Sequence, residues 1–265
     1  MRRSGPSFGR RHSSVKQQTQ HTVGMIAIQC AERKLCAMTY TPLAQRIGRA
    51  ATSAALGALL FAAAPLRAQA PASPAAPVGW VSRPDAGGMD HGASGRVAMT
   101  TMKPGFHVTT GPAGILFDST KMASGDWRLE ATLDLFDPGA RAEGFGVFFG
   151  GRDLNSSTPR YSYALLRRDG KALLKVRDGA TTRTVRDWTA NAGIPTWKGG
   201  PPGTSVKYQL VIEARGPRVT MWVGANQVLD AARTEMPTDG VVGLRINHSL
   251  NLHIENVTVS ALPKR

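Results

Sequence analysis

Cysteine is almost absent from this chain. Its two cysteines, Cys30 and Cys36, both lie near the start, so the later part of the chain cannot form a disulfide. A domain built from that part must rely on the burial of apolar side chains for its stability. Residues 80–265 suffice for this, because a chain of that length buries roughly 70% of the surface that it exposes when unfolded.

Long hydrophobic runs are also missing. The apolar run of residues 50–64 is shorter than the roughly 20 residues that a membrane-spanning helix needs. Arg46 and Arg49 precede this run, and the small-x-small sequence of residues 68–70 follows it. A basic segment, a short apolar run and such a cleavage site are the parts of a secretory signal peptide. We therefore predict cleavage after Ala70 and export to the periplasm or the medium.

The signal peptide divides the chain into four predicted parts. Residues 1–37 fit no signal peptide, whereas Met38 begins one of ordinary length, so residues 1–37 are predicted to be an over-extended, disordered start. Residues 38–70 are the signal peptide, residues 71–79 a flexible linker, and residues 80–265 the folded domain. No cysteine follows the apolar run, so the sequence predicts no lipid or membrane anchor.

Acidic residues are fewer than basic ones, but the excess lies mostly in the first 70 residues. After residue 70, 23 Lys and Arg stand against 17 Asp and Glu, giving a net charge of about +6 instead of the +15 of the whole chain. A mildly basic surface favours anionic partners. The chain has neither an Arg-rich tract nor an aromatic–basic RNA motif, which argues against nucleic acid as a partner.

Helical periodicity is absent from the predicted domain, and a period of two takes its place. Apolar and polar side chains alternate in residues 127–135, 206–212, 219–223, 242–246 and 250–254. This alternation is typical of strands with one buried face. It predicts an all-β fold.

Turn signals separate these strands. Asp169-Gly170 and Asp178-Gly179 favour hairpins, because both central residues of a type I′ turn need a positive φ. The parity of the apolar positions changes after Ile254, which predicts a β-bulge near Glu255-Asn256. Many short strands with evenly spaced turns predict a sandwich or a barrel, and the domain length favours a two-sheet antiparallel jelly-roll sandwich.

Several sequence runs carry a family resemblance. They are residues 105–112, 144–151, 160–163, 168–170, 187–189 and 240–248. Through these runs, residues 80–262 resemble secreted bacterial concanavalin A-like lectin/glucanase domains. Within that superfamily they are most similar to 3-keto-disaccharide hydrolase-like and family 16 glycoside hydrolase-like members. The resemblance implies a jelly-roll fold and an oligosaccharide or polysaccharide partner. It leaves catalysis open, because hydrolases, lectins and carbohydrate-binding modules share this fold.

Glutamate is scarce in the predicted domain. A retaining glycosidase needs two carboxylates about 5–5.5 Å apart, and the resembled laminarinase-like enzymes supply them as Glu-x-Asp-x-x-Glu on one strand. The five glutamates after residue 70 lie outside any such motif. The sequence therefore favours a carbohydrate-binding protein without the standard glucanase machinery.

Sugar-binding sites combine aromatic rings with a few well-placed polar groups. Tyr161 and Tyr163 share a strand face, and Trp188 follows a hairpin signal. Trp222, Arg245 and Asn247 have the parity opposite to their buried neighbours. An alternative is that the aromatics belong to the core or the rim. The predicted ligand-binding residues are Arg152, Tyr161, Tyr163, Trp188, Trp222, Arg245, Asn247 and His107.

Two other functions stay open from the sequence. One is a glycan-processing hydrolase or lyase with a non-standard active site, for which Asp153 and His248 are the catalytic candidates. The other is a periplasmic protein-interaction module. Residues 191–204 form a long connection that either lines a site or is an inert insertion. The predicted function requires no cofactor, but related sandwiches often carry a structural Ca²⁺, for which the resemblance offers Asp118 and Asp153 as ligands.

Overall fold

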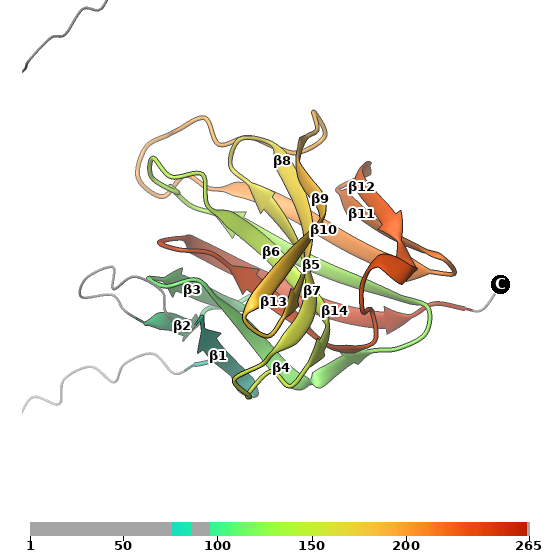
Figure 1. Ribbon diagram of the computed structural model, residues 1–265. Coiled ribbons are helices and arrows are strands. Elements are labelled where there is room, and N and C mark those ends of the chain that lie inside the picture. The colour runs from blue at the N-terminus through green and yellow to red at the C-terminus, as the bar shows by residue number, and fades with distance from the viewer. Residues whose placement is uncertain (1–75, 86–95, 264–265) are drawn as a thin grey trace, which may run out of the picture. The chain divides into compact units, whose positions relative to one another are not determined.

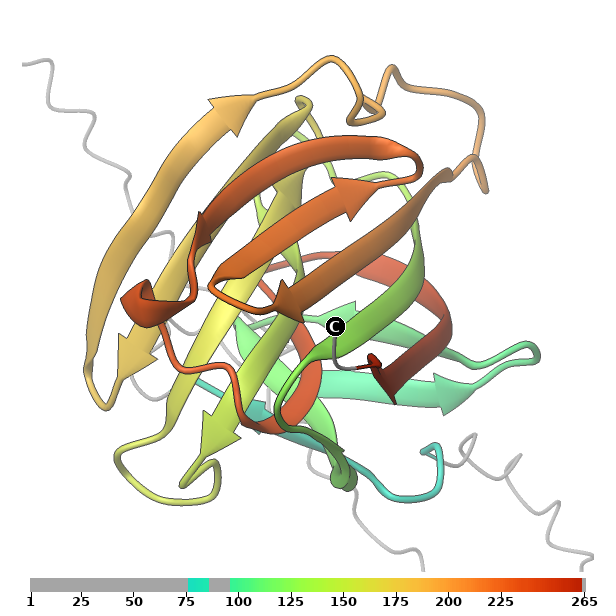
Figure 2. The same cartoon turned by 90° about the vertical axis from the view of Figure 1, so that its right-hand side faces the viewer.

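The computed structural model describes residues 76–85 and 96–263. Within these ranges the chain forms two antiparallel sheets of seven strands each, packed as a sandwich (Figure 1 and Figure 2). The predicted all-β, two-sheet fold is therefore confirmed. The predicted over-extended start, the signal peptide and residues 71–75 of the predicted linker lie outside the described residues. No helix within the described ranges is long and apolar enough to cross a membrane.

The two sheets are named here by their strands, in spatial order. Sheet A consists of β1 (Trp80–Pro84), β4 (Gly114–Ala123), β13 (Gly240–Ile246), β6 (Gly144–Arg152), β7 (Arg160–Arg167), β8 (Lys171–Asp178) and β9 (Thr181–Ala190). Sheet B consists of β12 (Asn226–Ala232), β11 (Arg218–Val223), β10 (Val206–Arg215), β5 (Trp127–Leu135), β14 (Asn251–Ala261), β3 (Phe106–Thr110) and β2 (Val97–Thr101). A short 3-10 helix, η2 (Arg233–Glu235), lies between β12 and β13.

The alternation of apolar residues places the main core between the two sheets. Strand β5 shows the pattern, because Trp127, Leu129, Leu133 and Leu135 are all buried while Glu130 points to solvent. The predicted strands at 127–135, 206–212, 219–223, 242–246 and 250–254 are all present. Burial of these side chains supplies the main driving force for folding, since the described part of the chain contains no cysteine.

Two local predictions are also confirmed. The predicted hairpins join β7 to β8 and β8 to β9, and Gly170 and Gly179 adopt a positive φ there. Asp169 and Asp178 do not, so neither turn is the expected type I′ turn. The register of β14 against β5 shifts between Ile254 and Asn256, which is the predicted bulge. Residues 191–205 connect β9 to β10 without a strand or helix.

Sheet A is apolar on both of its faces. Its outer face, which points away from sheet B, holds a second cluster of buried side chains, called the outer cluster here. The outer cluster consists of Ile115, Phe117, Phe148, Leu154, Tyr161, Tyr163, Leu165 and Leu173, with Trp188 and Val241 packed against it. One face of an antiparallel sheet commonly meets water and is polar. Because no member of the outer cluster is more than 7% exposed, this face of sheet A carries a second, smaller buried core.

Candidate functional site

Two predicted tyrosines and Arg245 meet in the outer cluster. The ring centroids of Tyr161 and Tyr163 lie 5.7 Å apart. Arg245 Nη1 lies 3.5 Å from the Tyr161 hydroxyl, and its guanidinium carbon lies 5.8 Å from the centroid of the Tyr163 ring. The strand register explains these contacts. Arg245 of β13 lies opposite Gly146 of β6, and because Gly146 has no side chain, the Arg245 side chain can extend across β6 to β7.

Trp188 and Asn247 lie at one end of the same face, beside Gly144. A Cβ atom built on Gly144 would lie 3.1 Å from the Trp188 indole and 3.4 Å from the Asn247 side-chain nitrogen. The Arg167 guanidinium lies 4.8 Å from the centroid of the Trp188 ring, a cation–π contact. Trp188 and Asn247 are half-buried. Each residue therefore keeps part of its surface exposed to solvent.

An ion triad fixes the polar side of the outer cluster. Asp85, just after β1, accepts hydrogen bonds from Arg245 Nη1 at 2.9 Å and Nη2 at 2.6 Å, and from Arg177 Nη1 at 2.8 Å. Burial raises the pKa of Asp85, but the hydrogen bonds and charges of Arg245 and Arg177 outweigh burial and hold that pKa below its ordinary 3.8. The triad is therefore two guanidinium groups around one ionised carboxylate.

The other three predicted ligand-binding residues lie away from this face. Trp222 is on β11 and His107 on β3, both pointing outward from sheet B. Arg152 ends β6 and lines a depression of about 420 Å³ together with Arg233 and Pro237. The structure thus brings together five of the eight predicted residues and leaves three apart.

Asp153 and His248 are not brought together. Asp153 follows the last residue of β6, whereas His248 follows Asn247, whose amide donates to the carbonyl of Gly144 at the first residue of β6. The length of β6, about 26 Å at 3.3 Å per residue, separates the two groups. His248 Nδ1 instead lies 3.7 Å from Glu143 Oε2. Asp153 and His248 cannot act on one bond in this arrangement.

The aspartates suggested for Ca²⁺ do not fit a calcium site. Asp118 accepts hydrogen bonds from the amide and hydroxyl of Thr120, at 3.0 Å and 2.7 Å, and these lower its pKa. Asp153 lies in a turn closed by Ser156. In the described ranges no group of three or more His, Cys, Asp or Glu side chains is placed to hold a metal ion.

A titratable row crosses the outer face of sheet B, and the sequence did not reveal it as a group. The register aligns Lys207, Asp134, His253 and His107 on adjacent strands. Burial raises the pKa of Asp134, and the charge and hydrogen bond of Glu255 raise it further. Lys207 pairs with both carboxylates. His253 alternates with the buried Leu252 and Ile254 and points outward, but only the strand order shows its neighbours. We assign this row no ligand, because its carboxylates are paired internally.

The long connection between β9 and β10 lines a depression of about 520 Å³. Its lining includes Asp169, Asn191, Ile194 and Lys198. None of the predicted aromatic ligand residues lines this depression. The structure therefore gives the connection a hollow surface but no aromatic platform.

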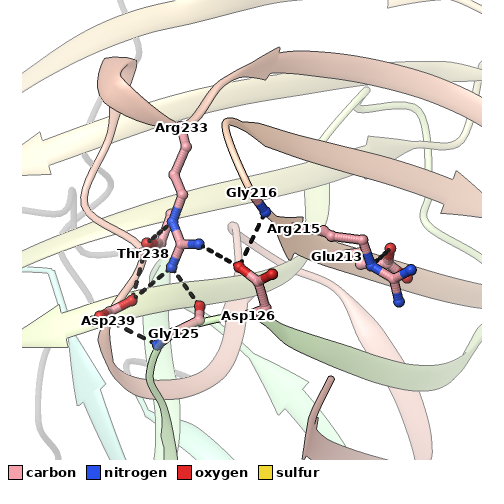
Figure 3. Close-up of polar contacts among 8 residues, drawn as sticks. All are labelled: Gly125, Asp126, Glu213, Arg215, Gly216, Arg233, Thr238 and Asp239. Atoms are coloured by element: carbon pink, nitrogen blue, oxygen red, sulfur yellow. Dashed lines mark hydrogen bonds and ion pairs between the residues drawn. The ribbon is translucent and has the colours of Figure 1, made fainter. Parts of the chain in front are cut away.

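The Arg233 network near the first residue of β13 is structural (Figure 3). Arg233 donates to Asp126 at 3.0 Å, to Thr238 at 2.9 Å and to Asp239 at 3.0 Å. Asp126 also accepts from the Gly216 amide at 3.0 Å. Arg233 thus joins the β4–β5 turn, the β10–β11 turn and the segment before β13. Each of its guanidinium nitrogens has a partner within the protein, so Arg233 is committed to holding these turns.

No protein-family model matches the chain, and no curated protein matches it. One similar solved structure is the carbohydrate-binding module CBM66 from Bacillus subtilis, at 17% identity over 69% of this chain and 96% of that chain, with a TM-score of 0.49.

Two further solved structures are similar to a comparable extent. A Bacillus subtilis protein of unknown function with a galectin-like fold has 11% identity, over 70% of this chain and 90% of that chain, with a TM-score of 0.47. The exoplasmic/lumenal domain of VIP36 in its Ca²⁺/Man-bound form has 9% identity, over 69% and 83%, with a TM-score of 0.46. The chain is a two-sheet antiparallel β-sandwich. The finer resemblance to 3-keto-disaccharide hydrolase-like and family 16 members stays a prediction.

Proposed function

We propose that this protein is an exported carbohydrate-binding β-sandwich that holds an oligosaccharide or polysaccharide on the outer face of sheet A. The observation that carries the proposal is the meeting of five predicted ligand residues on that face. They come from β7, β9, β13 and the residue after β13. These residues are Tyr161, Tyr163, Trp188, Arg245 and Asn247.

The chemistry of these groups suits a sugar. The partly exposed Trp188 ring offers a flat apolar surface for the C–H face of a pyranose, and its indole nitrogen adds a polar atom. Tyr161 and Tyr163, which are 1% and 7% exposed, belong to the buried cluster against which Trp188 packs. Asn247 and the arginines supply hydrogen-bond donors that fix hydroxyl groups. The buried part of the outer cluster holds Tyr163 and Trp188 in place, so little side-chain entropy is lost when a ligand binds.

The single carboxylate of the ion triad favours binding over acid catalysis on this face. A general acid must carry a proton near the working pH. Asp85 has a pKa below its ordinary value and is hydrogen-bonded to two arginines. It therefore acts as an anchor for Arg245 and Arg177 in the proposed site.

Thermal unfolding in the presence of a panel of neutral and acidic oligosaccharides tests the proposal. A ligand at about 100 times its Kd stabilises the folded protein by roughly 2.7 kcal/mol, which raises Tm by several degrees in a domain of this size. We expect a rise in Tm with one class of sugar. No rise with any sugar, together with no retention on immobilised polysaccharides, would overturn the proposal. A protein that co-purifies with the chain under those conditions would point instead to an interaction module.

Export is tested separately. The basic segment, apolar run and cleavage sequence of residues 46–70 predict a mature chain that begins at residue 71. Amino-terminal sequencing of the protein from a periplasmic fraction should give Pro71 as the first residue. Retention of the full chain in the cytoplasm would contradict export and leave the binding proposal untouched.

A further inference from the structure

The proposed binding face is lined by cations. The outward positions of β7 and β8 hold Arg167, Lys171, Lys175 and Arg177 in addition to apolar side chains, and Arg245 projects from β13. All the strand positions of β6, β7 and β8 are described, and none of the outward ones holds Asp or Glu.

Only part of this positive charge is balanced. Asp169 in the β7–β8 turn pairs with Arg167 Nη2 at 2.5 Å and lies 3.8 Å from Lys171 Nζ. At the other end, the single carboxylate of Asp85 serves both Arg245 and Arg177. One guanidinium charge of the Asp85 triad is therefore left over.

Lys175 adds a second unbalanced charge at the centre of the face. It lies directly opposite Tyr163 in the β7–β8 ladder, and no hydrogen bond or ion pair joins it to any residue in the described parts of the chain. Arg177 lies two positions further along β8, about 7 Å away, on the same side of the strand. Arg177 donates from Nε to the carbonyl of Gly179 and from Nη1 to Asp85. Its Nη2 atom has no hydrogen bond within the described parts of the chain.

The surroundings of these cations strengthen their attraction for an anion. Arg245 has a side chain that is only 10% exposed, and its Nε atom is buried with no hydrogen-bond partner in the described structure. The apolar outer cluster lies beneath the cations, which lowers the local dielectric.

We infer that the ligand is an acidic polysaccharide, recognised through the carboxylates of its uronic acid units. This inference rests on the proposed function and narrows it. A carboxylate between Lys175 and Arg177 accepts charge-assisted hydrogen bonds from both. Trp188 accounts for the contact with a sugar ring, and the unbalanced cations account for the acid groups of the polymer.

Matched pairs of oligosaccharides test this inference. Each pair has the same linkage and differs only in oxidation at C6: glucan with glucuronan, galactan with galacturonan, and mannan with mannuronan. Isothermal titration of the purified protein at low salt should show that the acid member of one pair binds at least roughly tenfold more tightly than its neutral partner. That advantage should fall as NaCl is raised, because added salt screens the charges on the face.

Substitution of a single cation provides a second test of the inference. Lys175→Met removes the unpaired cation and keeps a long apolar side chain, so it should reduce uronate affinity roughly tenfold and leave affinity for the neutral partner unchanged. Lys103→Met is the matched control, because Lys103 is exposed in the β2–β3 turn of sheet B. Circular dichroism and Tm of both variants should match those of the parent protein.

The outcomes separate the inference from the function on which it rests. Equal binding of neutral and acid partners overturns the uronate inference and leaves carbohydrate binding intact. A sulfated galactan that binds as tightly as galacturonan overturns the assignment to carboxylates. Binding of neither member of any pair overturns both proposals.

Discussion

Arg245 and Asp85 lie 160 positions apart in the sequence and form a two-pronged ion pair, with Nη1–Oδ1 at 2.9 Å and Nη2–Oδ2 at 2.6 Å. This pair ties the end of β1, at the edge of sheet A, to β13 near its centre. Planar guanidinium and carboxylate groups match in this geometry, which makes it stronger than a single hydrogen bond. The pair is both a structural tie and the anchor of the proposed binding face.

Removing the Asp85 carboxylate should destabilise the domain. Asp85→Asn leaves the Arg245 charge buried without a counter-charge, and we expect a loss of about 3 kcal/mol in the free energy of unfolding. Urea denaturation at pH 7 measures this loss. Asp178→Asn is the matched control, because the Arg160–Asp178 pair is exposed and should contribute less than about 1 kcal/mol. Equal effects of the two substitutions would show that the buried pair is no stronger than a surface pair.

The same substitution should change how stability depends on pH. The folded pKa of Asp85 lies below its unfolded value, so the unfolded chain binds more protons as the pH falls. The stability that Asp85 contributes is therefore full above about pH 4 and is lost as the pH falls through the folded pKa. The difference in unfolding free energy between parent and Asp85→Asn should shrink in denaturation curves taken from pH 5 to pH 2. A constant difference would contradict the assignment.

The Arg233 network predicts that a lysine at position 233 destabilises the domain, although it keeps the positive charge. Arg233→Lys cannot reach Asp126, Thr238 and Asp239 together, since lysine carries one nitrogen where arginine has a planar fork. We expect a loss of about 2 kcal/mol in unfolding free energy, measured by urea denaturation. Arg218→Lys at the exposed Arg218–Asp230 pair is the control and should change stability by less than about 1 kcal/mol. An Arg233→Lys protein as stable as this control would contradict the structural role.

A buried tyrosine offers a stabilising change. Tyr208 is fully buried in the main core against Phe145, and no partner for its hydroxyl exists among the described residues. Burial raises its pKa to about 12. Tyr208→Phe should stabilise the domain by about 1 kcal/mol, because it removes an unsatisfied polar group and keeps the ring. Denaturation with an unchanged m value would support this result, and a loss of stability would reveal a hidden partner for the hydroxyl.

Ligand binding should distinguish two half-exposed tryptophans. Trp188 lies on the proposed face of sheet A, and Trp222 points outward from sheet B. With the sugar that gives the largest rise in Tm, Trp188→Ala should weaken binding roughly tenfold or more, whereas Trp222→Ala should leave it unchanged. Titration calorimetry on both variants measures this. The reverse order of effects would move the site to sheet B.

The alternation of apolar residues by itself determined the strands and which side of each strand is buried. Parity placed Tyr161 and Tyr163 on one face and turned both Arg245 and Trp222 away from the core, because side-chain direction along a strand depends only on the period of two. The turn at Gly170 and the bulge after Ile254 are equally local. At both positions the backbone conformation is determined by residues that are adjacent in the sequence.

Only the tertiary structure decided which strands are neighbours. Arg245 and Trp222 both alternate with buried neighbours and so point away from the main core, yet Arg245 lies in sheet A and Trp222 in sheet B. The placement of β13 between β4 and β6 brings Arg245 to Tyr161, Tyr163 and Asp85. Such contacts join residues far apart in sequence, so they depend on how the two sheets close around a common core and not on any local pattern.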